Sequence, residues 1–170
     1  YYIQCSLKGK AEDYTDAYFW QQLRNRLPKN FKENLVIGPS IEKSIAPLRS
    51  FVVEPIQYGQ LFLVGDAAHI VPPTGAKGLN LAFSDVYYLS CALKSFYAGQ
   101  GSNELECYST RALSRIWKAV RFSWWMTTLM HEFPRADAFD RKIKLSEIDY
   151  LSNSKKAQTV FSENYVGLPL

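Results

Sequence analysis

The sequence has 170 residues, which is long enough for one domain with a packed core. Hydrophobic residues make up 47% of the sequence and aromatic residues 15%, a composition that excludes a disordered chain. The net charge of +4 permits anionic ligands but does not require them. No apolar run approaches the ~18 residues that a membrane-spanning helix needs, so we expect no membrane span.

The cysteines and histidines give no sign of a disulfide framework or a metal centre. Cys5, Cys91 and Cys107 are odd in number and form no CxxC pair. The two histidines, His69 and His131, are distant from each other in the sequence. We therefore expect buried structural thiols, no metal site and a reducing compartment, which favours the cytoplasm.

The first part of the chain predicts one strand and one helix. Residues 1–7 alternate well enough for a strand, in which Tyr2 is by default a core aromatic residue. The stretch 12–27 predicts a helix, with Asp13 or Thr15 as its N-terminal cap and the following proline as its end.

The next forty residues predict extended structure. Residues 29–40 form a polar connection, and Ile45–Val53 is expected to be extended. Arg49 in that segment would by default be a solvated charge at a sheet edge. Residues 58–60 turn the chain into the apolar run 61–64, which predicts a short strand buried on both faces.

The segment from Gly65 to Asn80 joins this strand to a helix and carries several candidate binding groups. Gly65 ends the strand and allows close approach of the backbone to a bulky group. We expect Asp66 to project from the carboxyl edge of the strand, where a carboxylate can accept hydrogen bonds from two hydroxyls. The helix that begins near Leu79 has N–H groups without internal partners, and these could stabilise negative charge on a ligand.

Other interpretations of this segment stay open. Gly65 and Asp66 alone also fit an ordinary strand–turn–helix connection with a capping aspartate. A phosphate-binding loop requires Ser or Thr after Lys77, but Gly78 stands there, so no hydroxyl is available for magnesium. We interpret His69 as a structural hydrogen-bonding group rather than as an acid–base catalyst.

Two long helices are predicted next. The first runs to about Ala98, with Gly99 suited to its C-terminal end. Its helically spaced apolar residues are Ala82, Val86, Leu89, Leu93 and Phe96. The second spans about 103–133, and its length of roughly 45 Å suits a subunit contact, although packing within the chain would also explain it. Its expected buried stripe is Leu105, Tyr108, Ala112, Ile116 and Ala119.

The C-terminal part is also predicted to be helical. Residues 136–150 form one helix, with Phe139 and Ile143 on its apolar face, and a final short helix leads to Tyr165. Basic and aromatic residues interleave in 115–125, but a helix with a buried aromatic face and a solvated charged face explains this better than nucleic-acid binding.

Several strings in this sequence resemble the flavoprotein aromatic hydroxylases. The segment 63–80 reads LVGDAAHIVPPTGAKGLN and is similar to the second FAD-binding motif of that family. The resemblance covers nearly the whole chain. It is strongest in SIAPLRSFVVEP (44–55), residues 61–82, RIWKA (115–119), RFSWWMT (121–127) and ENYVGLP (163–169).

The resemblance implies an α/β fold in three parts. Residues 1–60 would be the remainder of a substrate-binding mixed sheet. Residues 61–100 would supply the last strand of an FAD-binding sheet and the helix that follows it. Residues 101–170 would form a helical region that contributes to a homodimer.

The resemblance also implies how the cofactors are bound. Gly65 and Asp66 would belong to the FAD site, with Asp66 on the ribityl chain. The backbone amides of Leu79 and Asn80 would meet the pyrimidine edge of the flavin. Arg49 would lie near bound NADPH.

For the substrate, the resemblance implies a phenol with a carboxylate. Tyr2 would contact the carboxylate, the Pro73 carbonyl would touch the phenolic hydroxyl, and Thr74 would line the site. Tyr165 would join a tyrosine relay that ionises the phenol, whereas without the resemblance it would be a packing residue.

The implied reaction converts 4-hydroxybenzoate to 3,4-dihydroxybenzoate. NADPH would reduce FAD, O₂ would then form a flavin C4a-hydroperoxide, and its distal oxygen would be transferred to the phenol. A related phenolic acid is the alternative substrate.

The family's first FAD-binding motif does not occur in this sequence. No G-x-G-x-x-G is present, although that fingerprint holds the pyrophosphate of FAD. We therefore expect the chain to be the C-terminal part of such an enzyme, binding FAD weakly or not at all by itself. A non-catalytic assembly or partner-binding fragment is the alternative.

Overall fold

The computed structural model describes residues 1–6, 8–134, 136–167 and 169, and it divides the chain into two compact units. The first unit is Tyr1–Leu48 and the second is Arg49–Leu170. Residues 49–60 belong to the second unit, and the division of the chain at residues 60 and 100 stays a prediction. The functions assigned to the three predicted segments stay predictions.

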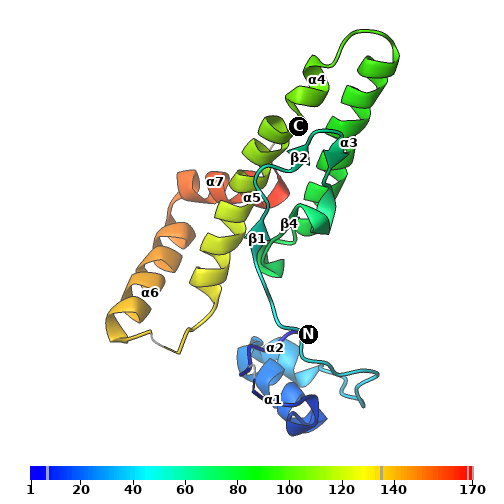
Figure 1. Ribbon diagram of the computed structural model, residues 1–170. Helices are drawn as coiled ribbons and strands as arrows, with labels where there is room; N and C mark the ends of the chain where they lie inside the picture. Colours follow the sequence, from blue (N-terminus) through cyan, green and yellow to red (C-terminus); the bar gives the residue numbers. More distant parts are fainter. Residues whose placement is uncertain (7, 135, 168, 170) are drawn as a thin grey trace. The chain divides into compact units, whose positions relative to one another are not determined.

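The first unit is built from short helices. A single 3₁₀ turn, Ala11–Asp13, precedes α1 (Asp16–Arg26), and α2 (Lys29–Glu33) follows (Figure 1). Thr15 caps α1, as predicted, because its hydroxyl accepts a hydrogen bond from the Tyr18 N–H at 3.2 Å. Helix α2 replaces part of the predicted polar connection, since Pro28 has a fixed backbone that suits a helix start.

Polar contacts fasten residues 38–43 to α1. The Trp20 indole N–H donates to the Gly38 carbonyl at 2.8 Å. The Asp16 carboxylate pairs with the Lys43 ammonium at 2.9 Å and accepts from the Ser40 N–H at 3.0 Å. The hydrogen bond from Lys43 and that from Ser40 lower the pKa of Asp16 to about 2.

The predicted strand at residues 1–7 is not found among its described residues. Residues 1–6 have no strand pairing, and Leu7 lies outside the described residues. The Tyr2 side chain is 91% exposed, so it is not a core residue of this unit. The described part of the unit contains no second strand with which residues 1–6 could pair, and an isolated strand leaves its backbone groups unsatisfied.

The second unit contains two small antiparallel sheets. In the first, β1 (Phe51–Val52) pairs with β4 (His69–Ile70). In the second, β2 (Gln57–Tyr58) and β3 (Leu61–Phe62) form a hairpin around Gly59, whose φ is 57°. Helices combined with small sheets are consistent with the predicted α/β class, and the finer sheet description stays a prediction.

Strand β3 is less buried than the sequence predicted. Leu61 is 61% exposed, and only Phe62 packs inward, edge-on against the Tyr108 ring at 5.7 Å. The apolar run is therefore not buried on both faces. Among the described strands, β3 pairs with β2 alone.

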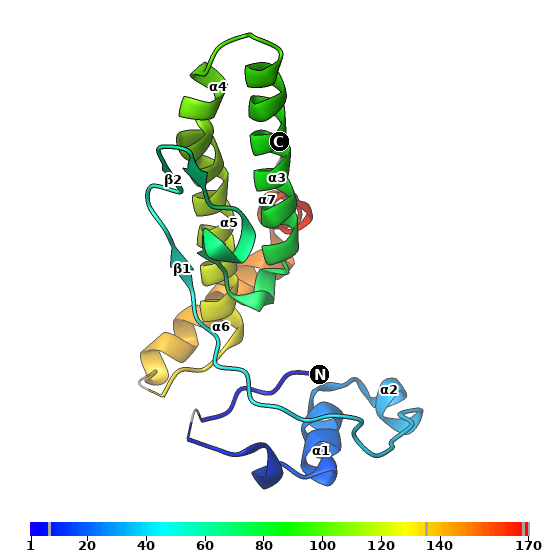
Figure 2. The ribbon, with the colours of Figure 1, turned by 45° about the vertical axis from the view of Figure 1, so that its right-hand side comes forward.

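Helices form the larger part of the second unit. Figures 1 and 2 show α3 (Gly78–Tyr97) and α5 (Tyr108–Met130) side by side, with the short α4 (Asn103–Glu106) between them in the chain. Gly99 follows α3 with φ of 77°, as predicted for its C-terminal end. The long helix predicted at 103–133 is interrupted at Cys107, which separates α4 from α5.

The core of the second unit lies between α3, α5 and the small sheets. Its buried residues are Ile56, Ala68, Val71, Leu81, Tyr88, Tyr108, Ala112 and Ile116. The predicted stripe of α5 is confirmed at Tyr108, Ala112 and Ile116.

Of the apolar residues that recur at helical spacing on α3, Ala82, Leu89 and Leu93 are half-buried, and Leu89 packs against the core. The residues that this helix buries are Leu81, Ser84, Asp85, Tyr88 and Ala92, while Val86 is 53% and Phe96 43% exposed. Apolar residues occur on several sides of α3, so helical spacing alone could not identify the buried side.

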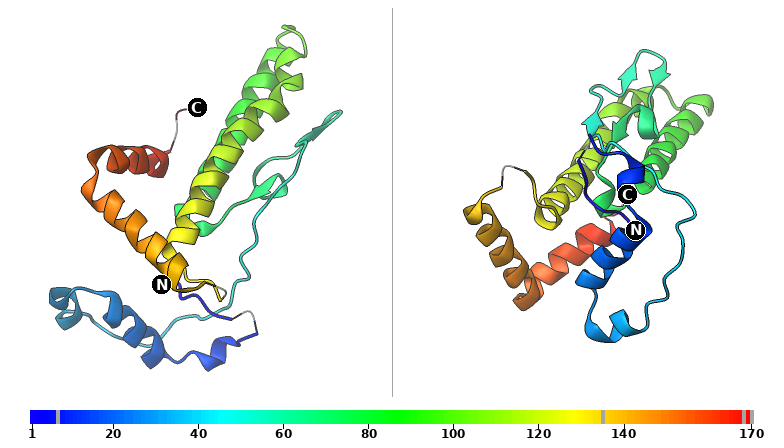
Figure 3. Two further views of the ribbon diagram at one scale, coloured as in Figure 1. Left: turned by 90° about the vertical axis from the view of Figure 1, so that its left-hand side faces the viewer. Right: turned by 90° about the horizontal axis from the view of Figure 1, so that it is seen from below.

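Two helices complete the chain, and Figure 3 shows them following α5. Helix α6 (Ala138–Asn153) begins with a capping box in which Asp137 and Asp140 bond each other's backbone N–H groups. Phe139 and Ile143, its predicted apolar face, are exposed. Helix α7 (Lys155–Val166) packs against α5 through Phe161, whose ring lies edge-on to Phe122 at 5.9 Å.

Candidate functional site

The turn after β3 presents Asp66 at the surface. Residues Gly65–Ala67 form one 3₁₀ turn, and Gly65 adopts φ of 58°, which a side chain would strain. The Asp66 carboxylate is exposed, on the turn rather than at the end of an extended strand as predicted. It is therefore accessible to a ligand that offers hydroxyl donors.

A buried aspartate lies behind this turn. The Asp85 carboxylate on α3 accepts a hydrogen bond from the Gly65 N–H at 3.0 Å. The same oxygen lies 2.7 Å from His69 Nε2, and both side chains are 1% exposed. Since that oxygen is an acceptor, His69 Nε2 is the donor. The hydrogen bonding predicted for His69 is present, and its purely structural role stays a prediction.

Sequence reasoning missed Asp85. The available signal was an ionisable residue within an otherwise apolar helix segment, because buried carboxylates need partners. The helical spacing of apolar residues on α3 does not include Asp85, so that pattern could not predict its role.

The loop that leads into α3 is closely packed against α5. Residues Pro73–Gly75 form a 3₁₀ turn, and Ala76 adopts a left-handed conformation with φ of 50°. The Thr74 and Thr127 hydroxyls are hydrogen-bonded, with 2.9 Å between the Oγ1 atoms. Gly75 is buried, and a Cβ there would lie 2.7 Å from Ser123 Oγ. The loop therefore has little room for larger side chains.

The N-terminus of α3 offers backbone donors. Lys77 is the N-cap residue, and its side chain makes no capping hydrogen bond. The first hydrogen bond back to it comes from the Leu81 N–H, at 2.9 Å. The N–H groups of Leu79 and Asn80 therefore have no partner within the helix, and both side chains are exposed. This end of α3 can accept an electronegative ligand edge.

Lys77 is buried and joins this loop to α7. Its ammonium donates to the Tyr165 carbonyl and lies 5.5 Å from the Phe122 ring centroid and 5.7 Å from that of Tyr165. Burial lowers the pKa of Lys77, and the charge of Arg115 lowers it further. These contacts engage the Lys77 amine with the backbone of α7 and with two aromatic rings.

Tyr165 lies in an aromatic cluster. Its ring stacks on Phe161 with centroids 5.8 Å apart and an interplanar angle of 13°, and it is edge-on to Phe122. The ring is nonetheless 49% exposed. Tyr165 therefore packs in the cluster while about half of its surface remains exposed.

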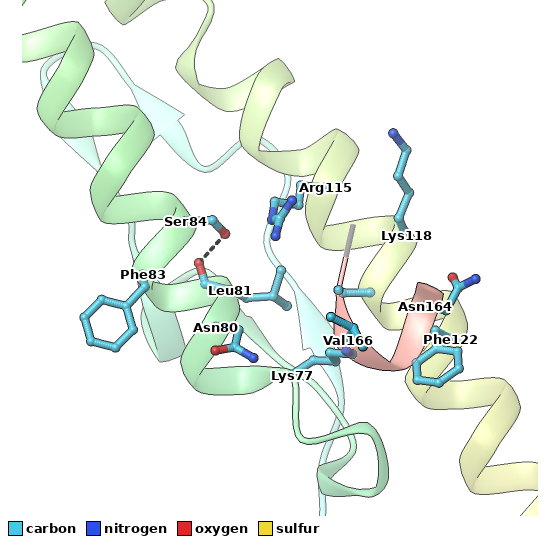
Figure 4. A pocket seen from close by; sticks show the side chains of 12 residues that line it. Lys77, Asn80, Leu81, Phe83, Ser84, Arg115, Lys118, Phe122, Asn164 and Val166 are labelled. Atoms are coloured by element: carbon cyan, nitrogen blue, oxygen red, sulfur yellow. Dashed lines mark hydrogen bonds between the residues drawn. The ribbon is translucent and has the colours of Figure 1, made fainter. Parts of the chain in front are cut away.

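A cavity of about 300 Å³ opens beside the start of α3 (Figure 4). Its wall comes from α3, α5 and the end of α7, and includes the candidate residue Asn80. Lys77, Arg115 and Lys118 supply cations, and no carboxylate lines the cavity among the described residues. Arg115 is held by a hydrogen bond to the Pro169 carbonyl at 2.7 Å. The cavity is therefore positively charged.

The structure thus brings together part of the predicted site. Lys77 stands between the loop that carries Pro73 and Thr74 and the start of α3. Its ammonium donates to the Tyr165 carbonyl, which connects this region with α7. Asp66 lies on the turn that packs against α3. Arg49 is exposed at the start of the second unit, with no described contact to these residues. Tyr2 belongs to the first unit.

The described residues contain neither a membrane-spanning helix nor a metal-binding cluster. None of the helices there has the length and apolar character needed to cross a membrane. The described ranges also contain no group of three or more His, Cys, Asp or Glu residues placed to hold a metal ion.

Comparison with known proteins relates the sequence to flavoenzymes. Residues 1–123 match the family described as "FAD binding domain". The chain is 58% identical to p-hydroxybenzoate hydroxylase from Acinetobacter baylyi over 169 residues, which is 99% of this chain and 42% of that protein. The chain thus spans less than half the length of this relative.

Two more distant relatives match shorter parts. Tetracenomycin B2 monooxygenase-dioxygenase from Streptomyces olivaceus is 41% identical over 54 residues, which is 32% of this chain and 10% of that protein. Rifampicin monooxygenase from Streptomyces venezuelae is 50% identical over 40 residues, which is 24% of this chain and 8% of that protein.

Proposed function

Because the chain belongs to the FAD-binding domain family, we propose that it is the C-terminal part of an FAD-dependent, NADPH-using monooxygenase that hydroxylates 4-hydroxybenzoate to 3,4-dihydroxybenzoate. The observation that carries the proposal is the 58% identity to p-hydroxybenzoate hydroxylase over 99% of the chain. The match to only 42% of that protein, and the missing G-x-G-x-x-G, support the part-enzyme proposal.

The residues of the second unit fit FAD. Gly65 has no side chain to obstruct a bulky ligand, and the exposed Asp66 carboxylate can accept from ribityl hydroxyls. The N–H groups of Leu79 and Asn80 can donate to the pyrimidine edge of the flavin. FAD, when bound, takes reducing equivalents from NADPH and activates O₂ for transfer to the substrate.

The protein groups would orient and ionise the phenol. The Pro73 carbonyl would accept from the phenolic hydroxyl, and Thr74, fixed by Thr127, would line the substrate position. Tyr165, which is 49% exposed, would pass on the phenolic proton through its hydroxyl. Tyr2 would contact the substrate carboxylate and Arg49 would lie near NADPH, and the exposure of both leaves them accessible.

We also propose a homodimer in a reducing compartment. Helix α6 exposes apolar side chains, and a groove of about 470 Å³ between α5 and α6 is lined by Trp125, Leu129, Phe133 and Ile143. The cysteines are all free, which supports a cytoplasmic location. Analytical ultracentrifugation should find a dimer, and a strictly monomeric species would contradict this part of the proposal.

The test of the function is FAD binding, measured by flavin fluorescence titration. The chain would be compared with a version extended by the residues encoded before Tyr1. We expect binding by the extended protein, and weak or no binding by the chain alone. The extended protein should then oxidise NADPH faster with 4-hydroxybenzoate than with 3-hydroxybenzoate, which serves as the control. Absence of FAD binding by both would refute the proposal and favour an assembly role.

A further inference from the structure

The turn that carries Asp66 is held from behind by one carboxylate oxygen. Asp85 Oδ2 accepts from the Gly65 N–H at 3.0 Å and from His69 Nε2 at 2.7 Å. Gly65 precedes Asp66 by one residue and His69 follows it by three. The same oxygen therefore fixes the chain on both sides of Asp66.

A second helix fixes the residue that leads into the turn. The Tyr108 hydroxyl on α5 donates to the Leu63 carbonyl at 2.8 Å. Asp85 and Tyr108 are each only 1% exposed, so neither can move without disturbing the core. The segment from Leu63 to His69 is thus attached to both α3 and α5, while the Asp66 side chain remains exposed.

Packing alone does not explain the choice of aspartate at position 85. Its second oxygen, Oδ1, is buried without a hydrogen-bond partner in the described chain, and the same holds for His69 Nδ1. Apolar side chains at both positions 85 and 69 would fill the same space without burying these two polar atoms. Burying the Asp85–His69 pair therefore costs folding free energy. A role in positioning the turn would explain why the pair is present despite this cost.

We infer that Asp85 is a positioning residue, which holds the Gly65–His69 turn so that the Asp66 carboxylate is directed at the FAD ribityl chain before the cofactor binds. The inference rests on the proposed function, because it assumes that Asp66 binds FAD. A turn that is already ordered before FAD binds raises the affinity for FAD. The conformational entropy of ordering the turn is then lost during folding and not on binding.

The test is a double-mutant cycle of FAD affinity in the upstream-extended protein. Asp66→Ala, Asp85→Ala and the double variant are titrated with FAD beside the unchanged protein. Asp85→Ala should weaken binding about tenfold, but less than about twofold when Asp66 is already alanine, because Asp85 acts through Asp66. Losses that add in the double variant, or an unchanged affinity in Asp85→Ala, would overturn the inference.

Asp85→Asn separates the hydrogen bonds from the charge. The amide oxygen can accept from Gly65 and His69, and the amide nitrogen would take the place of the unpaired Oδ1. We expect FAD affinity within about threefold of the unchanged protein, which amounts to rescue by the conservative variant. A loss as large as that of Asp85→Ala would overturn the hydrogen-bond mechanism.

Two further variants keep the test decisive. If Asp85→Ala does not fold, Tyr108→Phe takes its place in the cycle, because it removes only the bond to Leu63 and keeps the ring. Ile116→Val is the control for general destabilisation, since its side chain lies in the same core but makes no hydrogen bond to the turn, and the change should leave FAD affinity unchanged.

The two proposals fail in different ways. If the extended protein binds no FAD, the proposed function is refuted. If it binds FAD and Asp66→Ala weakens binding, but the cycle is additive, only the positioning role is refuted.

Discussion

Replacing Gly75 by alanine should destabilise the second unit through one contact. The added Cβ would lie 2.7 Å from Ser123 Oγ, and 3.4 Å from both Ser123 Cβ and Lys77 Cγ. Only the first distance is far below van der Waals contact, and Ser123 is fully buried on α5. Overpacking of this kind costs about 1–3 kcal/mol of unfolding free energy.

The Ser123 hydroxyl allows the steric explanation for Gly75→Ala to be tested. Ser123 Oγ has no hydrogen-bond partner in the described chain, so Ser123→Ala should be neutral or slightly stabilising. In that background only the 3.4 Å contacts remain, and Gly75→Ala should cost less than about 1 kcal/mol. The two substitutions should therefore be coupled by about 1–2 kcal/mol.

The assay is urea denaturation followed by tryptophan fluorescence, because Trp124 and Trp125 adjoin Ser123. Gly78→Ala is the matched control. A Cβ there meets nothing within 4 Å, and Gly78 is the first residue of α3, so this change should stabilise by about 0.4–1 kcal/mol. An equal cost of Gly75→Ala in both Ser123 backgrounds would refute the steric explanation.

Three other predictions concern the site and the first unit. In the upstream-extended protein, Tyr165→Phe should slow hydroxylation by at least about tenfold while FAD affinity changes little, and equal losses in the two assays would indicate a folding role. Asp66→Ala should weaken FAD binding about tenfold to a hundredfold in fluorescence titration, and an unchanged affinity would remove Asp66 from the site. The pKa of Asp16 is lowered to about 2, so its contribution to stability is present above the ordinary value of 3.8 and is lost as pH falls through about 2. A carboxyl NMR titration of Asp16 should show this, and Lys43→Met should return the midpoint toward 3.8; a midpoint near 3.8 in the unchanged chain would contradict it.

Local signals in the sequence predicted the helices well. The cap at Thr15, the glycine after α3 and the start of α3 near Leu79 were all visible, because each depends on a few neighbouring residues. The boundary between α4 and α5 at Cys107 was not, since no proline or glycine marks it.

Features that depend on tertiary contacts were predicted less well. The fully buried side of α3 does not follow from apolar spacing alone, because residues on several sides of that helix are apolar. The pairing of Asp85 with His69 joins residues from different elements, and spacing along one helix cannot reveal it. The candidate site was found from its motif, and the buried groups that support it became visible only in the structure.

Ala76 has a consequence for the mobility of the loop before α3. Its left-handed backbone costs about 1–2 kcal/mol relative to an ordinary conformation, a cost that glycine would avoid. A glycine at this position would, however, stand between Gly75 and Gly78 and leave three of four residues without side chains. The alanine therefore exchanges some conformational energy for stiffness, because its side chain restricts the backbone conformations open to the loop.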